Sequence, residues 1–429
     1  MPSRLAALAL LLECPRCHAT SWSTTGHEHH GLLTCDACKA QFHHIDDVLD
    51  LGEDAEARSV SLERKGVYRT EHDPELGGIN DAFDDLSRAE GGLRDAILAL
   101  PHGDDSRYYD EAGYFNNVRR SGPAFDFLVS HLDPRRGERL LDLGADLTWS
   151  TSHMARRGLD CTALDINHHL SVGRLFGSHY EAPYHLVRAD MSRASFRAGT
   201  FDIVLGVASL HHAANLDEAV GNIARILRPG GRLGFIEPYC ADAEAKAAFG
   251  RAQIEAGISE QTYMLPEWHR TLLKAGLRAR TFRIADSFAA VYELAPGGHQ
   301  DLFERFYEGR LSVAGGAPLT AAAGEPFEVP IALHNTGNAV WCSASQFPVY
   351  ASYHLSRRHE AGEAVVAFDN RRTSLPCEVG PGEETTMRLS VASPLEAGEY
   401  IADIDMVHEY VTWFAPKGLR GARIRFTVA

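Results

Sequence analysis

The sequence predicts a multidomain protein with a small cysteine-rich N-terminal unit, an α/β Rossmann-like core and a C-terminal all-β sandwich. Two Cys-x-x-Cys pairs lie within the first 40 residues, which indicates a metal-binding knuckle. From residue 138 onward, short apolar strands alternate with helical patterns, as in parallel sheets joined by crossover helices. After about residue 307, short β-rich runs recur between turn signals. We place the three parts at residues 1–54, 55–306 and 307–429.

Length and charge narrow the classes of protein. A chain of 429 residues is too long for one core, so several domains are expected. The formal net charge of -16 makes the surface repel phosphate backbones, so we expect no nucleic-acid partner. We also expect no membrane span, because no segment has the roughly 18 unbroken apolar residues that one needs.

The paired cysteines are Cys14, Cys17, Cys35 and Cys38, with seventeen residues between the two pairs. Two residues between thiolates let one tight turn aim both sulfurs at a single tetrahedral ion, as in a zinc ribbon. Four sulfurs leave no open coordination position, so the predicted zinc is structural. Disulfides or free thiols are the alternative. The other four cysteines are isolated, which favours a reducing cytoplasm as the location.

The knuckle follows an apolar run at 5–12, which we expect to form a strand or short helix. The segment reads LECPRC at 12–17, CDAC at 35–38 and FHHIDDV at 42–48. It resembles the small zinc-ribbon family that accompanies methyltransferases as a partner subunit or an N-terminal fusion. The resemblance covers about 40 residues.

The core is predicted element by element from its apolar runs and stop signals. Strands are expected at 139–143, 161–165, 185–189, 201–207, 232–236, 278–283 and 288–294. Helices are expected at 123–132, 149–157, 216–227 and 266–275, with a helix or loop around 170–176.

A glycine turn follows the first core strand and reads DLGADLT at 142–148. A strand that ends in an acid, then a glycine turn and a helix, brings backbone N–H groups close to a nucleotide-like ligand. Asp165 ends the next strand, where its carboxylate can accept both hydrogens of a ribose diol. Alone, this pattern fits nicotinamide enzymes as well as enzymes that use S-adenosylmethionine.

Later elements separate these two classes. The sequence reads RADM at 188–191, FDIVL at 201–205, SLHH at 209–212 and LRPGG at 227–231. In this order and spacing, about 150 residues resemble the class I S-adenosylmethionine-dependent methyltransferases. By that resemblance, Gly144 lets the methionine part approach, Asp190 bonds the adenine amino group and Met191 packs on the adenine. The predicted cofactor-binding residues are Asp142, Gly144, Asp146, Asp165, Ile166, Asp190, Met191 and Ser209.

Three of these predictions have alternatives. Asp165 and Asp190 could instead be solvated strand ends. Asp146 stands where the family usually has glycine, at a position whose backbone needs positive φ. Aspartate tolerates that conformation, and its carboxylate could pair with the donor's ammonium or repel its carboxylate. Repulsion would leave a noncatalytic scaffold with a degenerate donor site.

Methyl transfer to oxygen or nitrogen is an in-line displacement, and an alcohol acceptor also needs a base. The first candidates are His211 and His212, which follow the fourth core strand, with loop packing as the alternative. Glu237 and Tyr239, after the fifth strand, come next. Tyr109 and Tyr114 could form a lid within a helical segment that precedes the core, or could be plain core aromatics.

The C-terminal part predicts about seven strands, at 327–333, 349–353, 364–368, 386–391, 398–406, 410–414 and 422–428. The runs VPIALHNTG at 329–337 and GEY at 398–400 resemble immunoglobulin-like modules of bacterial polysaccharide-handling proteins. That resemblance implies glycan-related work, an assembly partner or a homo-oligomer. Trp341, Trp413 and Phe414 could stack on sugar faces or fill the core.

These observations predict a methyltransferase that acts on a hydroxyl of a small-molecule or saccharide acceptor, most simply a sugar or glycan-linked metabolite. The cofactors expected are S-adenosylmethionine and a structural zinc ion. A methyltransferase for a lipid, quinone or natural product is one alternative. The noncatalytic scaffold is the other.

Overall fold

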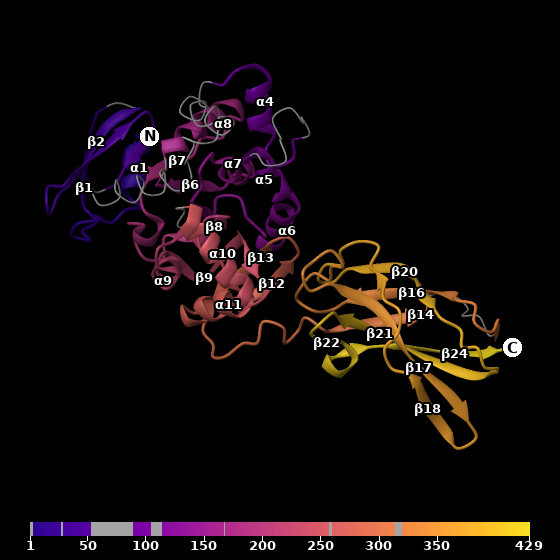
Figure 1. Ribbon diagram of the computed structural model, residues 1–429. Helices are drawn as coiled ribbons and strands as arrows, with labels where there is room; N and C mark the ends of the chain where they lie inside the picture. The colour runs from indigo at the N-terminus through magenta and orange to yellow at the C-terminus, as the bar shows by residue number, and fades with distance from the viewer. Residues whose placement is uncertain are drawn as a thin grey trace. The chain divides into compact units, whose positions relative to one another are not determined.

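The computed structural model describes residues 3–26, 29–52, 89–103, 114–166, 168–256, 260–313 and 320–429 (Figure 1). These fall into two compact units. The first comprises Met1–Arg280 with Ser287–His299, and the second Thr281–Asp286 with Gln300–Ala429. Tyr109 and residues 55–88 of the predicted lid segment lie outside the described residues, and Tyr114 is described only as the start of a helix.

The first unit is built on one eleven-stranded sheet in the order β1-β2-β3-β4-β7-β6-β5-β8-β9-β13-β12. Its strands are β1 (Trp22–Gly26), β2 (His30–Cys35), β3 (Gln41–Ile45), β4 (Val48–Asp50), β5 (Arg139–Leu143), β6 (Asp160–Asp165), β7 (His185–Arg188), β8 (Phe201–Val207), β9 (Leu227–Glu237), β12 (Leu277–Ile284) and β13 (Phe288–Leu294). Neighbours from β4 through β9 are parallel, and β13 is antiparallel to β9. A separate short sheet pairs β10 (Tyr239–Cys240) with β11 (Tyr263–Met264).

The strand order places the ligand-binding edge of the sheet. β6 and β7 lie on one side of β5, and β8 and β9 lie on the other. The chain therefore reverses its direction of winding between β5 and β8, and ligands of such sheets bind outside the carboxyl ends of the strands at that point. The central strands are buried along almost their whole length, as expected for a sheet covered on both faces.

Helices connect and cover these strands. They are α1 (Arg4–Ala9), α4 (Gly91–Ala99), α5 (Tyr114–Arg120), α6 (Gly122–Leu132), α7 (Trp149–Ala155), α8 (Gly173–His179), α9 (Leu216–Ile226), α10 (Ala243–Ala256) and α11 (Leu265–Lys274). Short 3-10 turns are η3 (His168–Val172), η4 (Met191–Arg193) and η5 (Leu210–His212). The helix α9 starts where the Asn215 side chain accepts a hydrogen bond from Glu218 N–H, and it ends before the predicted stop signal. Among the described residues, no helix combines the length and apolar character needed to cross a membrane.

The cysteine-rich segment joins the core through its sheet. β3 and β4 form a tight hairpin whose turn residues, Asp46 and Asp47, both have positive φ. β4 then runs parallel to β7, with Leu49 opposite Val187. The segment from β1 to β4 therefore extends the sheet of the core, whereas the sequence predicted a separate small unit.

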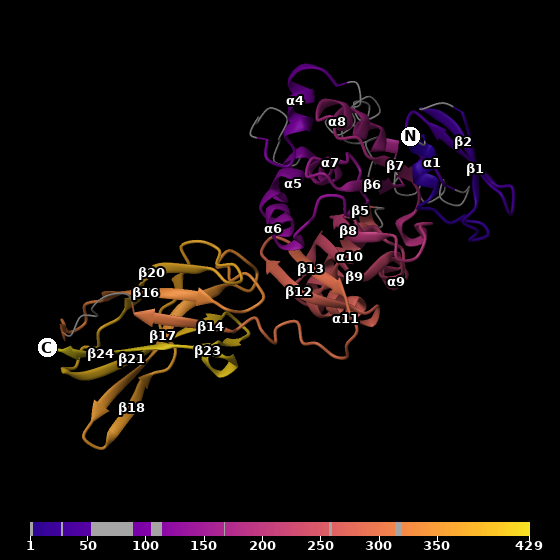
Figure 2. The ribbon, with the colours of Figure 1, turned by 180° about the vertical axis from the view of Figure 1, so that it is seen from behind.

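The second unit is strand-rich, as predicted. Its strands are β14 (Gly309–Val313), β15 (Thr320–Ala321), β16 (Phe327–Asn335), β17 (Val349–His359), β18 (Gly362–Ala367), β19 (Thr373–Ser374), β20 (Glu384–Val391), β21 (Gly398–His408), β22 (Thr412–Trp413), β23 (Leu419–Arg420) and β24 (Ala422–Val428). The short turn η6 (Ala415–Lys417) lies between β22 and β23. A four-stranded sheet has the order β20-β16-β14-β23, and Figure 2 shows its strands β20, β16 and β14 side by side. The other sheet contains β15, β24, β21, β17 and β18, with β19 and β22 at its side. The likeness to immunoglobulin-like modules stays a prediction.

Two of the three aromatic residues for which sugar stacking and core packing were both open are core residues. Trp341 and Phe414 are both 0% exposed, and their rings pack edge to face. The Trp341 indole N–H also donates to the Phe306 carbonyl at 2.8 Å. Only Trp413 keeps part of its surface, and it packs against His354. Of the two readings that the sequence left open, core packing therefore holds for Trp341 and Phe414.

Candidate active site

The glycine turn after β5 is locked against the loop after β8. Gly144 has φ +67°, and a Cβ added there would lie 2.3 Å from Cβ of Ser209. The Ser209 hydroxyl donates to the Leu143 carbonyl at 2.7 Å. Glycine at this position therefore serves two needs, a left-handed backbone and room for Ser209.

The same turn holds two further residues in the left-handed region. Asp146 has φ +40° and Thr148 has φ +62°. The Asp146 N–H donates to Oδ2 of Asp165 at 2.8 Å, and the Thr148 hydroxyl lies 2.8 Å from the hydroxyl of Tyr184. A β-branched residue with positive φ is unusual, and such strain concentrates at ligand sites. Asp165 thus fixes the turn, and Ile166 follows it directly, half-buried.

Asp142 organises the start of α7 beneath the turn. Its Oδ2 accepts hydrogen bonds from the hydroxyls of Ser150 and Thr151, both at 2.6 Å. Burial raises the pKa of Asp142 to about 6, although these hydroxyls oppose the shift. The side chain predicted to bind cofactor is therefore buried beneath the turn and bonded to the helix that follows it.

The loop after β7 brings Met191 next to the glycine turn. Oδ1 of Asp190 accepts from the Ser192 N–H at 2.8 Å and so begins the short turn η4. Met191 follows, and its Cε lies 3.4 Å from the position of a Cβ on Gly144. Residues predicted to contact the two ends of one donor molecule thus meet at the ends of β5, β7 and β8.

Glu237 holds the residues after β8 from below. It is 0% exposed, and Oε1 accepts hydrogen bonds from the backbone N–H groups of Ser209 and Leu210, at 3.0 and 2.8 Å. Oε2 lies 2.7 Å from Nδ1 of His211 and also accepts from the backbone N–H of His211 at 3.3 Å. One buried carboxylate therefore fixes the backbone of three residues and the ring of one histidine.

The histidine pair lies between this carboxylate and the glycine turn. The rings of His211 and His212 are 4.1 Å apart and tilted by 36°. Burial lowers the pKa of His212 to about 3, helped by His211 and opposed by the nearby carboxylate of Asp146. The ring of His212 is therefore neutral at physiological pH. Tyr239, on β10, is buried.

Among the residues that the structure describes, two groups of side chains could hold a metal ion. The four paired cysteines are the first, with Sγ–Sγ distances of 3.6 Å for Cys14–Cys38 and for Cys17–Cys35. Thiolates bound at about 2.3 Å to a tetrahedral ion lie about 3.8 Å apart, so these sulfurs fit such an ion and are too far apart for disulfides.

The second group, His211, His212 and Glu260, also has ligand atoms within 4.8 Å of one another. Its two imidazole rings are tilted by 36° to each other, and Nδ1 of His211 lies 2.7 Å from Oε2 of Glu237, a carboxylate outside the group.

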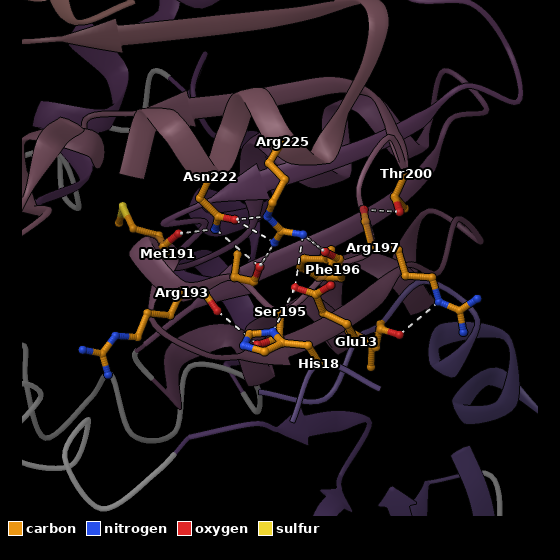
Figure 3. Close-up of polar contacts among 12 residues, drawn as sticks. Glu13, His18, Met191, Arg193, Ser195, Phe196, Arg197, Thr200, Asn222 and Arg225 are labelled. Carbon is orange, nitrogen blue, oxygen red and sulfur yellow. Dashed lines mark hydrogen bonds and ion pairs between the residues drawn. The ribbon is translucent and has the colours of Figure 1, made fainter. Parts of the chain in front are cut away.

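A polar cluster links the N-terminal segment to the loop after β7 (Figure 3). The Arg225 guanidinium, on α9, contacts Glu13 and donates to the Phe196 carbonyl. Asn222, one turn earlier on α9, donates to the Met191 carbonyl at 3.4 Å. Sequence reasoning missed both α9 residues, because side chains that bind backbone carbonyls follow no motif.

Comparison with known proteins identifies the core. A family model described as "Methyltransferase domain" matches residues 141–235, from the glycine turn to β9. The core of this chain is a class I methyltransferase domain. The resemblance to S-adenosylmethionine-dependent enzymes covers this same domain, so the match supports S-adenosylmethionine as the methyl donor.

The methyltransferase domain has relatives with different acceptors. It is 29% identical over 133 residues to a ubiquinone biosynthesis O-methyltransferase of Erwinia tasmaniensis, covering 30% of this chain and 55% of the relative. A demethylmenaquinone methyltransferase of Mycobacterium marinum is 36% identical over 167 residues, 39% of this chain and 62% of the relative. A malonyl-[acyl-carrier protein] O-methyltransferase of Enterobacter lignolyticus is 30% identical, over 26% of this chain and 43% of the relative. The chain thus spans less than two thirds of each.

Proposed function

We propose that the protein transfers the methyl group of S-adenosylmethionine to a hydroxyl of a small-molecule acceptor, with a quinone-type phenol as the first candidate. The observation that carries the proposal is the convergence of the glycine turn, Met191 and the Glu237–His211 pair on one edge of the sheet. The relatives named for quinone biosynthesis favour the phenol over the sugar. The sugar keeps less support because Trp341 and Phe414 are buried.

His211 is the proposed base. A carboxylate on Nδ1 requires a proton on that nitrogen, so Nε2 is the one that can accept a proton from an acceptor hydroxyl. Glu237 would stabilise the imidazolium that results, as an orienting carboxylate does in other catalytic sites. His212, packed on His211, would limit the ring's rotation.

The donor, when bound, supplies an electrophilic methyl group on a sulfonium. The acceptor oxygen forms the new C–O bond with its lone pair while the C–S electron pair returns to sulfur, and the hydroxyl proton goes to His211. The chain's own contribution is alignment: Gly144 and Met191 border the place of the donor, and the loop held by Glu237 presents the base.

We further propose that the four cysteines hold zinc in a structural role. All four sulfurs are needed for a tetrahedral site, so no position is left for a substrate. The cysteines lie in two turns, and an ion bound by all four would hold these turns together.

The first experiment is calorimetric titration with S-adenosylmethionine and S-adenosylhomocysteine. Binding in the micromolar range supports the donor site, and absent binding at several temperatures would favour the noncatalytic scaffold. Transfer of a radiolabelled methyl group to a panel of catechols, demethylated quinones, fatty acyl thioesters and saccharides then tests the acceptor. Transfer only to saccharides would reject the quinone-type phenol.

A further inference from the structure

The loop after β7 carries the predicted adenine contacts, and the N-terminal segment pairs with the strand that leads into it. Asp50 on β4 lies opposite Arg188, the last residue of β7, and the two side chains form an ion pair. Leu51 N–H donates to the Arg188 carbonyl at 2.9 Å. The chain is therefore fixed two residues before Asp190.

The same segment also holds the exit of the loop. Glu13 N–H donates to the Ser195 carbonyl at 3.0 Å, and Arg197 N–H donates to the Leu11 carbonyl at 2.9 Å. The Arg197 side chain adds a bond from Nε to the Leu12 carbonyl at 3.1 Å. Both ends of the stretch 189–197 thus bond to a part of the chain more than a hundred residues away.

Arg225 binds the exit of the loop and the N-terminal segment together (Figure 3). Its Nη1 lies 3.1 Å from Oε1 of Glu13 and donates to the Phe196 carbonyl at 2.8 Å. Its Nη2 donates to the Ala194 carbonyl at 3.2 Å. A guanidinium has five donors in one rigid plane, so a single side chain can hold an acid and two carbonyls at fixed positions.

Glu13 is also the residue directly before the first cysteine of the knuckle. The turn that presents Cys14 and Cys17 closes with a bond from His18 N–H to the Cys14 carbonyl at 2.8 Å. Cys14 N–H donates to the Ala19 carbonyl at 2.8 Å. An ion bound by the four sulfurs would therefore fix the peptide from which the Glu13 side chain reaches Arg225.

We infer that the cysteine segment is a positioning element of the donor site, and that its metal sets donor affinity by holding the loop 189–197. This inference rests on the proposed function. Only the molecules whose loop is in place bind donor, so the apparent Kd rises in proportion as that fraction falls. Glu13 and Arg225 are positioning residues, because they act on Asp190 and Met191 through the loop backbone.

The first test compares metal-loaded and metal-depleted full-length protein. Metal is removed with a chelator under reducing conditions, and S-adenosylhomocysteine binding is measured by calorimetry with far-ultraviolet dichroism as a check on folding. We expect affinity to fall about tenfold or more on depletion and to return on adding zinc, as for a loop whose competent fraction drops to a tenth.

A second test keeps the metal in place. Glu13→Gln removes the charge that faces Arg225, and we expect donor affinity to fall about threefold to tenfold, because a weaker neutral hydrogen bond can replace the charge-assisted one. Asp217→Asn is the matched control, since Asp217 also lies on α9 and pairs with the exposed Lys274, away from the loop. Amide exchange in 189–197 should rise in Glu13→Gln and stay unchanged in the control.

The outcomes separate the two proposals. If the metal-loaded wild type binds neither S-adenosylmethionine nor S-adenosylhomocysteine, the proposed function fails. If the wild type binds donor, but folded metal-depleted protein and Glu13→Gln bind it equally well, the positioning role is overturned. A fall in thermal stability with unchanged donor affinity and unchanged exchange in 189–197 would likewise reject it, leaving the metal a purely structural role.

Discussion

The replacement Glu237→Gln tests the proposed base most directly. The carboxylate accepts from Ser209 and Leu210 through Oε1 and from His211 through Oε2. A glutamine must face one of these pairs with its NH2 group. Facing Ser209 and Leu210 would set it against two backbone donors, at a cost of about 1–3 kcal/mol each. Facing His211 sets it against one backbone donor and a ring nitrogen that can change its protonation.

We therefore expect the amide to face His211 and the ring to move its proton to Nε2. In that orientation the amide NH2 replaces the oxygen that accepts from the His211 backbone N–H, so the free energy of unfolding should fall by about 1–3 kcal/mol. Nε2 can then no longer accept the acceptor's proton, and kcat should fall by about 10²–10⁴-fold, the usual contribution of a general base.

The assay is methyl transfer from labelled donor to the acceptor found in the panel, with donor affinity measured separately by calorimetry. Asp202→Asn is the control, because Asp202 is also a buried carboxylate that accepts a backbone N–H, from Arg139 at 2.7 Å, but lies at the amino ends of the strands. It should lose stability and keep kcat. Retention of half the wild-type kcat by Glu237→Gln would refute the base assignment.

Three further predictions concern the turn after β5. Gly144→Ala should abolish donor binding, because its Cβ would lie 2.3 Å from Cβ of Ser209. Gly137→Ala is the control, because Gly137 has φ +84° and no atom within 4 Å of an added Cβ, so this variant reports the cost of positive φ alone. An equal fall in melting temperature for the two variants would contradict this reasoning. The pKa of Asp142 is about 6 in the folded protein against about 3.9 in the unfolded chain, so its contribution to the free energy of unfolding falls by about 2–3 kcal/mol as the pH rises from 4 to 6. Asp142→Asn should remove this pH dependence in denaturant titrations between pH 4 and 7. Asp146→Gly keeps the N–H that bonds Asp165, so donor affinity should stay within about threefold of wild type; a tenfold loss would show that the carboxylate itself binds the donor.

The core strands could be predicted closely because their signal is local. Residues 139–143 and 288–294 were predicted as strands and are β5 and β13, since short apolar runs bounded by charged or glycine residues leave few other solutions. α10 was not predicted, because its alanine-rich and charged sequence has no clear apolar face. β9 begins at Leu227, five residues before the predicted start, because Leu227, the first residue of LRPGG, already pairs with Phe201.

The pairing of β4 with β7 could not be predicted. A strand of three residues has no useful periodicity, and nothing in its sequence specifies which sheet edge it meets. The contacts of Arg225 with carbonyls are hidden for a similar reason, since every residue offers a carbonyl. By contrast, the resemblance named Gly144, Met191 and Ser209 as residues of one site, and the structure brings them together. They could be named in advance because each follows a parallel strand, and the carboxyl ends of parallel strands share one edge of the sheet.

The strand β4 also covers the outer edge of β7. A parallel sheet that stopped at β7 would offer a row of unpaired amide and carbonyl groups to any passing chain, the usual starting point of strand-by-strand aggregation. Here that row is already taken by Val48–Asp50. Removing the first 52 residues would thus expose the unpaired edge of β7 as well as deleting the cysteines. Loss of solubility in such a truncation would report the exposed edge strand rather than the loss of the metal.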